Sequence, residues 1–373
     1  MITELSTIGI AVLGASTLSL LVLVTYYFYF FTGLQASEAL AKEEQRPFSI
    51  IIAARNEREN LEQNLPAILN QDYPNFEVVV VNDGSWDGTK EYLKELSLQV
   101  PKLKVVTVNL DEKFRRGKKF ALTLGIKGAS HEHLLFTDAD CKPASDKWLQ
   151  NMANAMGNAD MALGNSPLTV KRTLLGSIVN YETFHTAVQY FGYANRKQPY
   201  MGVGRNLAYT KTLFFDNKGF ASHQHIMSGD DDLFVQEVAT KSNTSICLSP
   251  ESFTYSPGPN SFKEWITQKT RHLSTGQLYK GRFKILLGTY SLFQLLIYVL
   301  SILFIILHPR HWWLGMCPLA VKWLIQWTVI LGPSKKLGYK RVGYALPYYD
   351  LLYTLFLFFF GITKPFMKPK TWN

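Results

Sequence analysis

Long apolar runs lie at both ends of the chain. No charged residue occurs from Ile8 to Phe31, and this run is longer than the roughly 20 residues that cross a bilayer as a helix. Three more apolar spans follow near the C-terminus, at about 285–307, 313–331 and 344–362. A cleaved signal peptide is the alternative for the first run, but no basic residue precedes it and its apolar stretch is too long. We therefore expect an N-terminal membrane anchor and about three C-terminal spans.

Between these runs, short β-rich segments alternate with segments whose apolar residues have helical spacing. The first four β-rich segments are 48–54, 76–85, 104–108 and 134–140. Strands that alternate with helices in this way predict a mostly parallel, doubly wound α/β sheet. Further strand candidates begin at Ala162 and follow the glycine turn at 202–204, on either side of a long aromatic stretch.

The fourth β-rich segment ends in two carboxylates, Asp138 and Asp140. Residues two apart on a strand share a face, and ligands of open α/β sheets bind at the carboxyl edge of the strands. The pair can therefore share one divalent cation, and such oxygen ligands suit Mg²⁺ or Mn²⁺ held jointly with a substrate diphosphate. An isolated Asp-x-Asp is more often an acidic turn, so this interpretation depends on the other motifs.

Two further segments carry charge in patterns that favour chemistry. Gly117 precedes Lys118 at the expected start of a helix, where backbone N–H groups and cationic side chains form an anion site. A solvated basic turn would give the same pattern. Three consecutive acids, at 230–232, open another expected helix. Because one or two acids would satisfy a helix N-terminus, the surplus suggests a carboxylate used for chemistry.

The composition limits the classes of partner. The net charge of +10 could indicate nucleic acid, but much of it lies beside the apolar spans, where the positive-inside bias and anionic lipid head groups explain it. Three cysteines without a C-x-x-C pair favour neither a disulfide framework nor a zinc ribbon. His223 and His225 have no third ligand nearby in sequence, as a zinc site would need. We expect a membrane partner, no nucleic acid, and a reducing, cytosolic setting.

Taken together, the motifs of residues 47–276 resemble those of the inverting family 2 glycosyltransferases, whose nucleotide-sugar-binding domain has the GT-A fold. The matching segments, in the family's order, are IIIAARNE, VVVVNDGSWDGT, GKKFAL, FTDADC, GVGRNLAY and GDDDLF. QKTRH is similar to the Q-x-x-R-W signature of processive synthases and ceramide glucosyltransferase-like enzymes, with His272 in place of tryptophan. The resemblance implies metal-dependent, inverting transfer of a sugar from a nucleotide-sugar, of the UDP type, to a hydroxyl of a lipid or lipid-linked acceptor.

The resemblance also implies a role for each motif. Asp83 would contact a uracil-type base, and Asp138 and Asp140 would hold Mg²⁺ or Mn²⁺. The family register makes Asp230 the general base, with Asp231 as the alternative. The other residues expected to bind the nucleotide-sugar are Ala54, Arg55, Glu57 and Lys118. The residues expected to contact the acceptor or diphosphate are Gly204, Arg205, Asn206, Gln268, Arg271 and His272.

These motifs and the apolar runs together predict an integral membrane protein, of the inner membrane if the source is bacterial. The expected parts are an anchor and linker at 1–46, a cytosolic GT-A domain at 47–280 and a membrane region at 281–373. A processive polysaccharide synthase is the alternative within the family, although three spans are few to line a polymer channel. A sugar nucleotidyltransferase would need a glycine-rich signature near the first strand, which AARNERENL does not supply. A non-catalytic membrane scaffold would not need the full set of acids.

Overall fold

The computed structural model describes residues 5–34, 45–108, 117–226, 228–339 and 342–363. They form two compact units, which are described separately. The helical unit takes its described residues from Met1–Leu34, Thr173–Gly192 and Tyr279–Lys368. The sheet unit takes its described residues from Gln35–Arg172 and Tyr193–Leu278.

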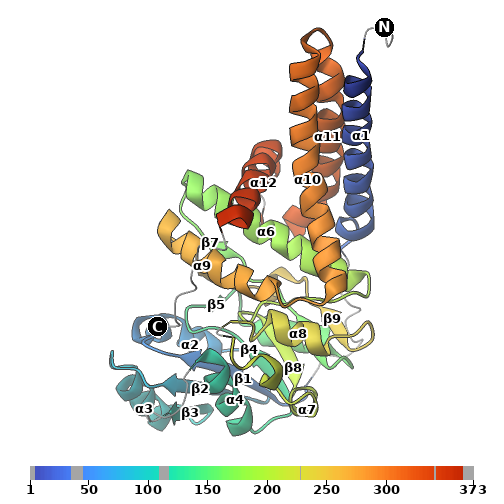
Figure 1. Ribbon diagram of the computed structural model, residues 1–373. Helices are drawn as coiled ribbons and strands as arrows, with labels where there is room; N and C mark the ends of the chain where they lie inside the picture. Colours follow the sequence, from blue (N-terminus) through green and yellow to red (C-terminus); the bar gives the residue numbers. More distant parts are fainter. Residues whose placement is uncertain (1–4, 35–44, 109–116, 227, 340–341, 364–373) are drawn as a thin grey trace. The chain divides into compact units, whose positions relative to one another are not determined.

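The sheet unit is built on a seven-stranded sheet with the order β3-β2-β1-β4-β8-β6-β9 (Figure 1). Its strands are β1 (Phe48–Ala54), β2 (Phe76–Asp83), β3 (Leu103–Val108), β4 (His133–Phe136), β6 (Met161–Leu163), β8 (Leu207–Thr210) and β9 (Thr244–Ile246). The first four pair in parallel, and β8 is antiparallel to both β4 and β6. The predicted mostly parallel α/β sheet is therefore confirmed. A second, three-stranded sheet has the order β5 (Lys142–Pro143), β10 (Thr254–Pro257), β7 (Leu168–Thr169).

The helices of the sheet unit cover the sheet and carry the segments between strands. They are α2 (Arg58–Leu69), α3 (Thr89–Gln99), α4 (Lys118–Gly128), α5 (Trp148–Met156), α7 (Lys211–Asp216), α8 (Asp232–Val238) and α9 (Phe262–Gly276). Short 3-10 turns occur at Ala221–His223 and Pro250–Ser252. The alternation of β1, α2, β2, α3 and β3 places helices on the crossovers between parallel strands, as such connections require.

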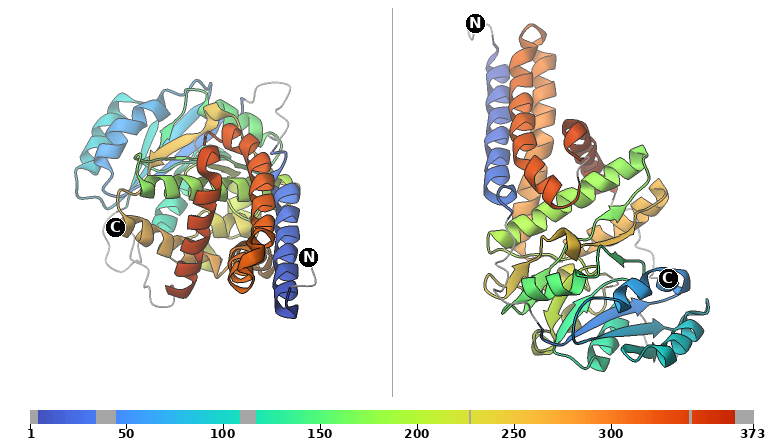
Figure 2. Two further views of the ribbon diagram at one scale, coloured as in Figure 1. Left: turned by 90° about the horizontal axis from the view of Figure 1, so that it is seen from above. Right: turned by 180° about the vertical axis from the view of Figure 1, so that it is seen from behind.

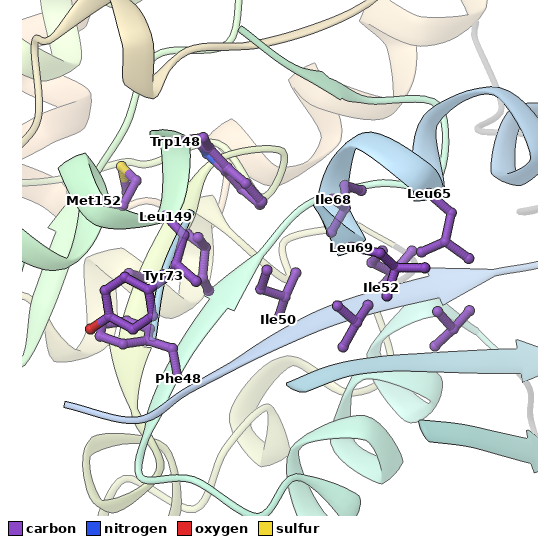
Figure 3. Packing of buried hydrophobic residues seen from close by; sticks show 14 of the residues in the cluster. Phe48, Ile50, Ile52, Leu65, Ile68, Leu69, Tyr73, Trp148, Leu149 and Met152 are labelled. Atoms are coloured by element: carbon purple, nitrogen blue, oxygen red, sulfur yellow. The ribbon is translucent and has the colours of Figure 1, made fainter. Parts of the chain in front are cut away.

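The core of the sheet unit lies on both faces of β1. All seven of its residues are buried, as expected for a parallel strand covered on both sides. Phe48, Ile50 and Ile52 belong to one buried cluster with residues of α2 and α5 (Figure 3). Ile51 points to the opposite face, where a Cβ on Gly125 of α4 would lie 2.8 Å from it. This close approach of α4 fixes the position of its N-terminus, which carries Lys118.

The helical unit contains the apolar helices. They are α1 (Thr7–Tyr26), continued by a π-helical turn at Tyr27–Phe31, α10 (Gly281–Leu307), α11 (Trp312–Lys336) and α12 (Leu346–Thr363), with short turns at Pro309–His311 and Val342–Ala345. Helices α1, α10 and α11 lie side by side (Figures 1 and 2). Among the described residues, three helices are long and apolar enough to cross a membrane, at Thr7–Phe31, Gly281–Leu307 and Pro309–Lys336. Within the part of the last predicted span that the structure describes, α12 contains a shorter apolar helix, Leu346–Gly361.

A buried ion pair explains the one acid of the last apolar segment. Asp350 of α12 is 1% exposed and pairs with Lys322 of α11. It also accepts hydrogen bonds from Gln294 and Tyr298 of α10 and from Gln326 of α11. An acid at this depth is tolerated where its charge is paired and faces protein. Asp350 therefore faces protein.

Helix α6 (Leu174–Asn195) departs from the predicted organisation. The sequence placed all of 47–280 in one domain, whereas Thr173–Gly192 groups with the apolar helices. Two polar contacts explain this grouping. Tyr181 donates to Asp350 at 3.0 Å, and His185 Nε2 lies 3.0 Å from the Tyr290 hydroxyl.

Candidate active site

The paired acids lie in a turn rather than on a strand. Because β4 ends at Phe136, Asp138 and Asp140 follow it, and the Cys141 N–H donates to the Asp138 carbonyl at 3.1 Å to close the turn. The expectation that strand alternation would place them on one face is therefore wrong. Burial raises the pKa of Asp140, and the nearby charge of Asp138 raises it further. The turn thus holds two carboxylates close enough to repel each other.

The two acids fit a divalent cation that takes its remaining ligands from elsewhere. Among the described residues, no three His, Cys, Asp or Glu side chains are arranged to hold a metal ion. Mg²⁺ is commonly bound by one or two carboxylates together with water and substrate phosphates. Burial also raises the pKa of Glu57, and the charges of Asp140 and Asp138 add to this effect. The excess of negative charge is what a bound cation would relieve.

The Lys118 ammonium joins the turn to the second group of acids. Its Nζ lies 2.8 Å from Asp138 Oδ1 and 3.1 Å from Asp230 Oδ2. Burial opposes the charged ammonium, but Asp138, Asp230 and Asp231 outweigh it, so that the pKa of Lys118 lies above its ordinary value. The start of α4, the end of β4 and the segment before α8 therefore meet at one point.

The three consecutive acids have three different environments. Asp231 caps α8: its side chain accepts from the N–H of Asp232 at 2.7 Å and from the N–H of Gly204 at 2.8 Å. Asp232 is 7% exposed and accepts from the Thr275 hydroxyl of α9 at 2.6 Å. Asp230 precedes the helix and pairs with Lys118. Capping thus occupies Asp231 and tertiary packing occupies Asp232, whereas Asp230 is the acid that pairs with a lysine.

The pKa values of the neighbouring acids move in opposite directions. Burial opposes ionisation of Asp230, but Lys118 outweighs it and the pKa of Asp230 lies below its ordinary value. Burial raises the pKa of Asp231 to about 7, with further contributions from Asp230 and Asp232. The site therefore holds Asp230 ionised and disfavours the charge of Asp231.

The glycine loop before β8 lies against these acids. A Cβ on Gly204 would lie 3.5 Å from both Asp230 Oδ2 and Asp231 Oδ2, an ordinary contact distance. Arg205 donates from its guanidinium to Ser256 Oγ at 2.8 Å and is half-buried. The loop therefore forms one wall of the site.

Asn206 does not have the predicted role. Its side chain is fully buried, donates to the carbonyls of Asn165 and Ser252 at 2.8 and 2.7 Å, and accepts from Trp148 Nε1 at 3.0 Å. These partners occupy the amide, so the expectation that Asn206 contacts the acceptor or diphosphate is wrong. It ties together three segments of the sheet unit.

The residues predicted to bind the nucleotide lie where two parallel strands end. Ala54 and Asp83 are the buried last residues of β1 and β2, and the register pairs Ala54 with Asn82. Arg55 and Glu57 follow β1 and are half-buried. These four positions therefore share one edge of the sheet.

Sequence reasoning missed Asn56, which links the two loops at this edge. Its N–H donates to Ser85 Oγ at 2.9 Å, and its Oδ1 accepts from the Trp86 N–H at 3.0 Å. Its φ of 55° lies in the left-handed region, which asparagine tolerates better than most residues. Asn56 lies within the IIIAARNE segment, whose polar end follows the first strand.

Lys119 was also missed. Its Nζ donates to the carbonyls of His223 and Ile226 at 2.7 and 3.1 Å, which holds the segment before the three acids. Burial lowers the pKa of Lys119 to about 8, although Asp230 and Asp232 act in the opposite direction. The adjacent lysines therefore have separate tasks, one facing the acids and one supporting the chain beside them.

Helix α9 carries the residues of the QKTRH segment. Gln268 and Arg271 are half-buried, whereas His272 is exposed. The hydrogen bond between Thr275 and Asp232 fixes α9 to the start of α8. The segment is thus attached to the acids, although no described contact joins Gln268 or His272 to them.

Comparison with known proteins finds similar sequences over part of the sheet unit and most of α6. Residues 49–194 match the family model for glycosyl transferase family 2. The glycosyltransferase AglE of Haloferax volcanii is 33% identical over 174 residues, which cover 45% of this chain and 52% of AglE. The poly-beta-1,6-N-acetyl-D-glucosamine synthase of Staphylococcus epidermidis is 29% identical over 199 residues, which cover 51% of this chain and 45% of the synthase. The matches thus span about half the length of these relatives.

A solved structure shares the fold over most of the chain. The mannosyltransferase PcManGT from Pyrobaculum calidifontis, in complex with GDP-Man and Mn²⁺, aligns with a TM-score of 0.56 at 18% identity, covering 93% of this chain and 98% of that one. At this identity, the likeness supports the fold alone.

Proposed function

We propose that this chain, whose residues 49–194 match the family model for glycosyl transferase family 2, transfers a sugar, with inversion, from a nucleotide-sugar to a hydroxyl of a lipid or lipid-linked acceptor. The observation that carries the proposal is the meeting of Asp138, Lys118 and Asp230 at one point. These residues come from separate segments, and neither ion pair is needed to close the sheet. The Lys118 ammonium can bind an anionic leaving group, and the Asp230 carboxylate can accept the proton of a hydroxyl.

The donor binds at the carboxyl edge of β1, β2 and β4. Asp83 and Ala54 lie at the base of the edge, with Arg55 and Glu57 beside them. Lys118 donates to the diphosphate. Asp138 and Asp140 would hold Mg²⁺ or Mn²⁺, and the bound cation would offset the charge that develops on the leaving group.

Asp230 takes the proton of the attacking hydroxyl. A general base of this kind commonly contributes roughly 10²–10⁴-fold to the rate. When Lys118 turns to the diphosphate, Asp230 loses the partner that lowers its pKa, and its basicity rises. Asp231 is the alternative base, but two backbone N–H groups already occupy its oxygens.

The acceptor side consists of the glycine loop and α9. Gly204 lies against the acids, and Arg205, Gln268, Arg271 and His272 offer donors and acceptors for the acceptor or the diphosphate. Arginine suits this task because its fork matches phosphate oxygens. The three long apolar helices support a membrane-held protein and therefore a lipid or lipid-linked acceptor. The donor is of the UDP type, and the sheet unit lies on the cytosolic side.

Processive polysaccharide synthesis is the second candidate function. It is favoured by the match to the poly-beta-1,6-N-acetyl-D-glucosamine synthase, which covers about half of each chain. Among the described residues, two C-terminal helices are long enough to span a membrane.

A donor screen tests both candidates. The purified protein, with Mn²⁺ or Mg²⁺ and membrane lipid extract, is incubated with UDP- and GDP-sugars, and released nucleoside diphosphate is measured. Sizing of the product then separates one added sugar from a polymer. No metal-dependent release with any donor would contradict the proposed function, and a ladder of products would favour the synthase.

A further inference from the structure

The helical unit contains a cavity of about 210 Å³ between α6, α10 and α12. His185 of α6, Gln294 of α10 and Thr354 of α12 are buried residues of its wall. None of the lining residues belongs to the motifs of the candidate active site. The cavity is therefore a separate feature that the proposed function does not explain.

Two buried polar atoms in the wall have no hydrogen-bond partner among the described residues: Gln294 Oε1 and His185 Nδ1. The side-chain Nε2 of Gln294 donates to Asp350 Oδ1 at 2.6 Å, which fixes the amide and turns Oε1 away from the acid. His185 uses its other ring nitrogen to bond Tyr290. Both residues are at most 4% exposed. Since buried polar atoms are normally paired, this end of the cavity suits a ligand with a hydrogen-bond donor.

Apart from the hydroxyl-bearing Tyr290, Ser291 and Tyr353, the rest of the lining is apolar. Leu295 and Leu357 line it, together with Leu292 and Phe358, which are 53% and 50% exposed. Helix α10 is long and apolar enough to cross a membrane, so lipid chains would cover these exposed side chains. The cavity is smaller than the roughly 300–1,000 Å³ that encloses a whole small molecule. It is sized for one end of a lipid whose chains remain in the bilayer.

The charge of the cavity distinguishes among lipids. No lysine or arginine lines it, and Lys322, the buried cation of the helical unit, is bonded to Asp350 and Tyr298. A phosphate head group would thus lack a cationic partner. Gln294 Oε1 accepts hydrogen bonds only, so it selects a donor such as a hydroxyl.

We propose that this cavity binds the head of an uncharged membrane lipid that carries a free hydroxyl. The hydroxyl donates to Gln294 Oε1, and the apolar chains lie over Leu292 and Phe358. Binding of this kind requires no sugar transfer. If lipid binding at this cavity fails, the proposed function is unaffected. If sugar transfer fails, lipid binding at this cavity is unaffected.

Photolabelling by a diacylglycerol probe tests the proposal. The full chain is placed in phosphatidylcholine nanodiscs with a photoactivatable diacylglycerol. The competitors are unlabelled diacylglycerol, its O-methyl ether and phosphatidic acid with the same chains. We expect labelled peptides from α10 or α12. Competition by the ether and by phosphatidic acid should be roughly tenfold weaker than by diacylglycerol. The ether leaves Gln294 Oε1 unpaired, and phosphatidic acid buries an unpaired charge. Equal competition by all three lipids would overturn the proposal. So would labelling that no competitor reduces, which is the result expected of a cavity filled by water.

Two substitutions on one helix give a matched control. Ser291→Trp adds bulk at an exposed residue of the cavity wall, and Ile306→Trp adds it at a 68% exposed residue of α10 outside the cavity. We expect labelling to fall roughly tenfold in the first variant and to stay at the wild-type level in the second. Equal labelling of both variants would show that the lipid does not occupy this cavity.

Discussion

Asp230 and Asp231 are adjacent in the sequence, but their carboxylates differ in partner and in charge state. Lys118 lowers the pKa of the first, whereas burial and two neighbouring acids raise the pKa of the second to about 7. Sites in which adjacent acids have pKa values pushed apart commonly give them separate tasks. In our proposal, Asp230 accepts the proton, while Asp231 caps α8 and holds the Gly204 loop.

The two matched variants Asp230→Asn and Asp231→Asn separate these tasks. Each keeps the shape of the side chain and removes its basicity. We expect Asp230→Asn to lower the rate of transfer by roughly 10²-fold or more with little change in donor affinity, and Asp231→Asn to be milder. The measurements are initial rates of transfer and titration of the donor. An inactive Asp231→Asn beside an active Asp230→Asn would move the base by one residue, and near-normal rates in both would reduce the acids to a helix cap.

The raised pKa of Asp231 predicts a pH dependence of stability. The ordinary value is 3.8, and the folded value is about 7. Between these values, the folded state holds a proton that the unfolded state has lost, so stability falls as the pH rises. We expect the thermal midpoint to decrease less between about pH 5 and 7 in Asp231→Asn than in the wild type. Asp231→Asn also changes the hydrogen bonds of this side chain, but that effect is the same at every pH and does not alter the slope of the thermal midpoint against pH. Parallel slopes for the variant and the wild type would contradict the prediction.

Asp140→Ala tests the cation site. Because the raised pKa of Asp140 shows that the folded state disfavours its charge, the variant should fold as stably as the wild type. We expect transfer, and the increase in donor affinity caused by Mn²⁺, to fall by roughly 10²-fold or more. Asp146→Ala removes the same charge from an exposed position after β5 and should leave transfer and donor affinity unaffected. Donor affinity that is equal with and without Mn²⁺ in the wild type would contradict the prediction.

At the scale of elements, the strands were predictable from the sequence because burial on both faces makes them continuous apolar runs. The predicted segment at 48–54 agrees with β1 in both bounds, and the segment at 76–85 begins with β2 and ends two residues after it. The edge at which the acids gather followed from the parallel order. The antiparallel insertion of β8 between β4 and β6 depends on long-range pairing that no local pattern encodes.

The positions that sequence reasoning misread are governed by tertiary contacts. Asn206 lies in a motif beside the site, yet its amide bonds three buried groups of other segments. The two acids after β4 lie in a turn, since the strand ends two residues before Asp138. The helical unit includes most of α6 because Tyr181 and His185 bond to α12 and α10. Neither contact leaves a periodic signal in the sequence.

The hydrogen bond between α9 and α8 gives a prediction at this scale. Thr275→Val keeps the shape of the side chain but leaves the buried Asp232 carboxylate without its donor from α9. We expect the free energy of unfolding to fall by about 1–3 kcal/mol, together with a weaker effect on donor binding than on acceptor use. Thr267→Val, at an exposed position where the hydroxyl bonds within α9, is the control. Equal thermal midpoints for the two variants would show that the bond does not stabilise the protein.

At the scale of the whole molecule, the boundary between the two units falls within α6, near Gly192. One continuous helix therefore connects the apolar helices to the segment that leads into the Gly204 loop. The helical unit has its own buried polar centre at Asp350, and the sheet unit has its own apolar core. Each unit thus has its own internal contacts that stabilise its helices and strands. We expect a substitution in the core of one unit to destabilise that unit before the other.

The exposed apolar surface of the helical unit predicts how the protein is held in the cell. Large apolar side chains on its three long helices are exposed, with Ile8, Ile285, Ile306 and Leu324 each more than 60% exposed. Hydrocarbon would cover such surfaces at roughly 25 cal/mol per Å², a contribution that salt does not screen. A protein held only by its basic residues would be released at high ionic strength, since the Debye length falls to about 3 Å at 1 M salt. We expect the full chain to remain in the membrane fraction after 1 M salt and after carbonate, and to be extracted by detergent. A peripheral protein of the same membranes, released by carbonate, is the control, and recovery of the intact chain in the carbonate supernatant would contradict a membrane-integral unit.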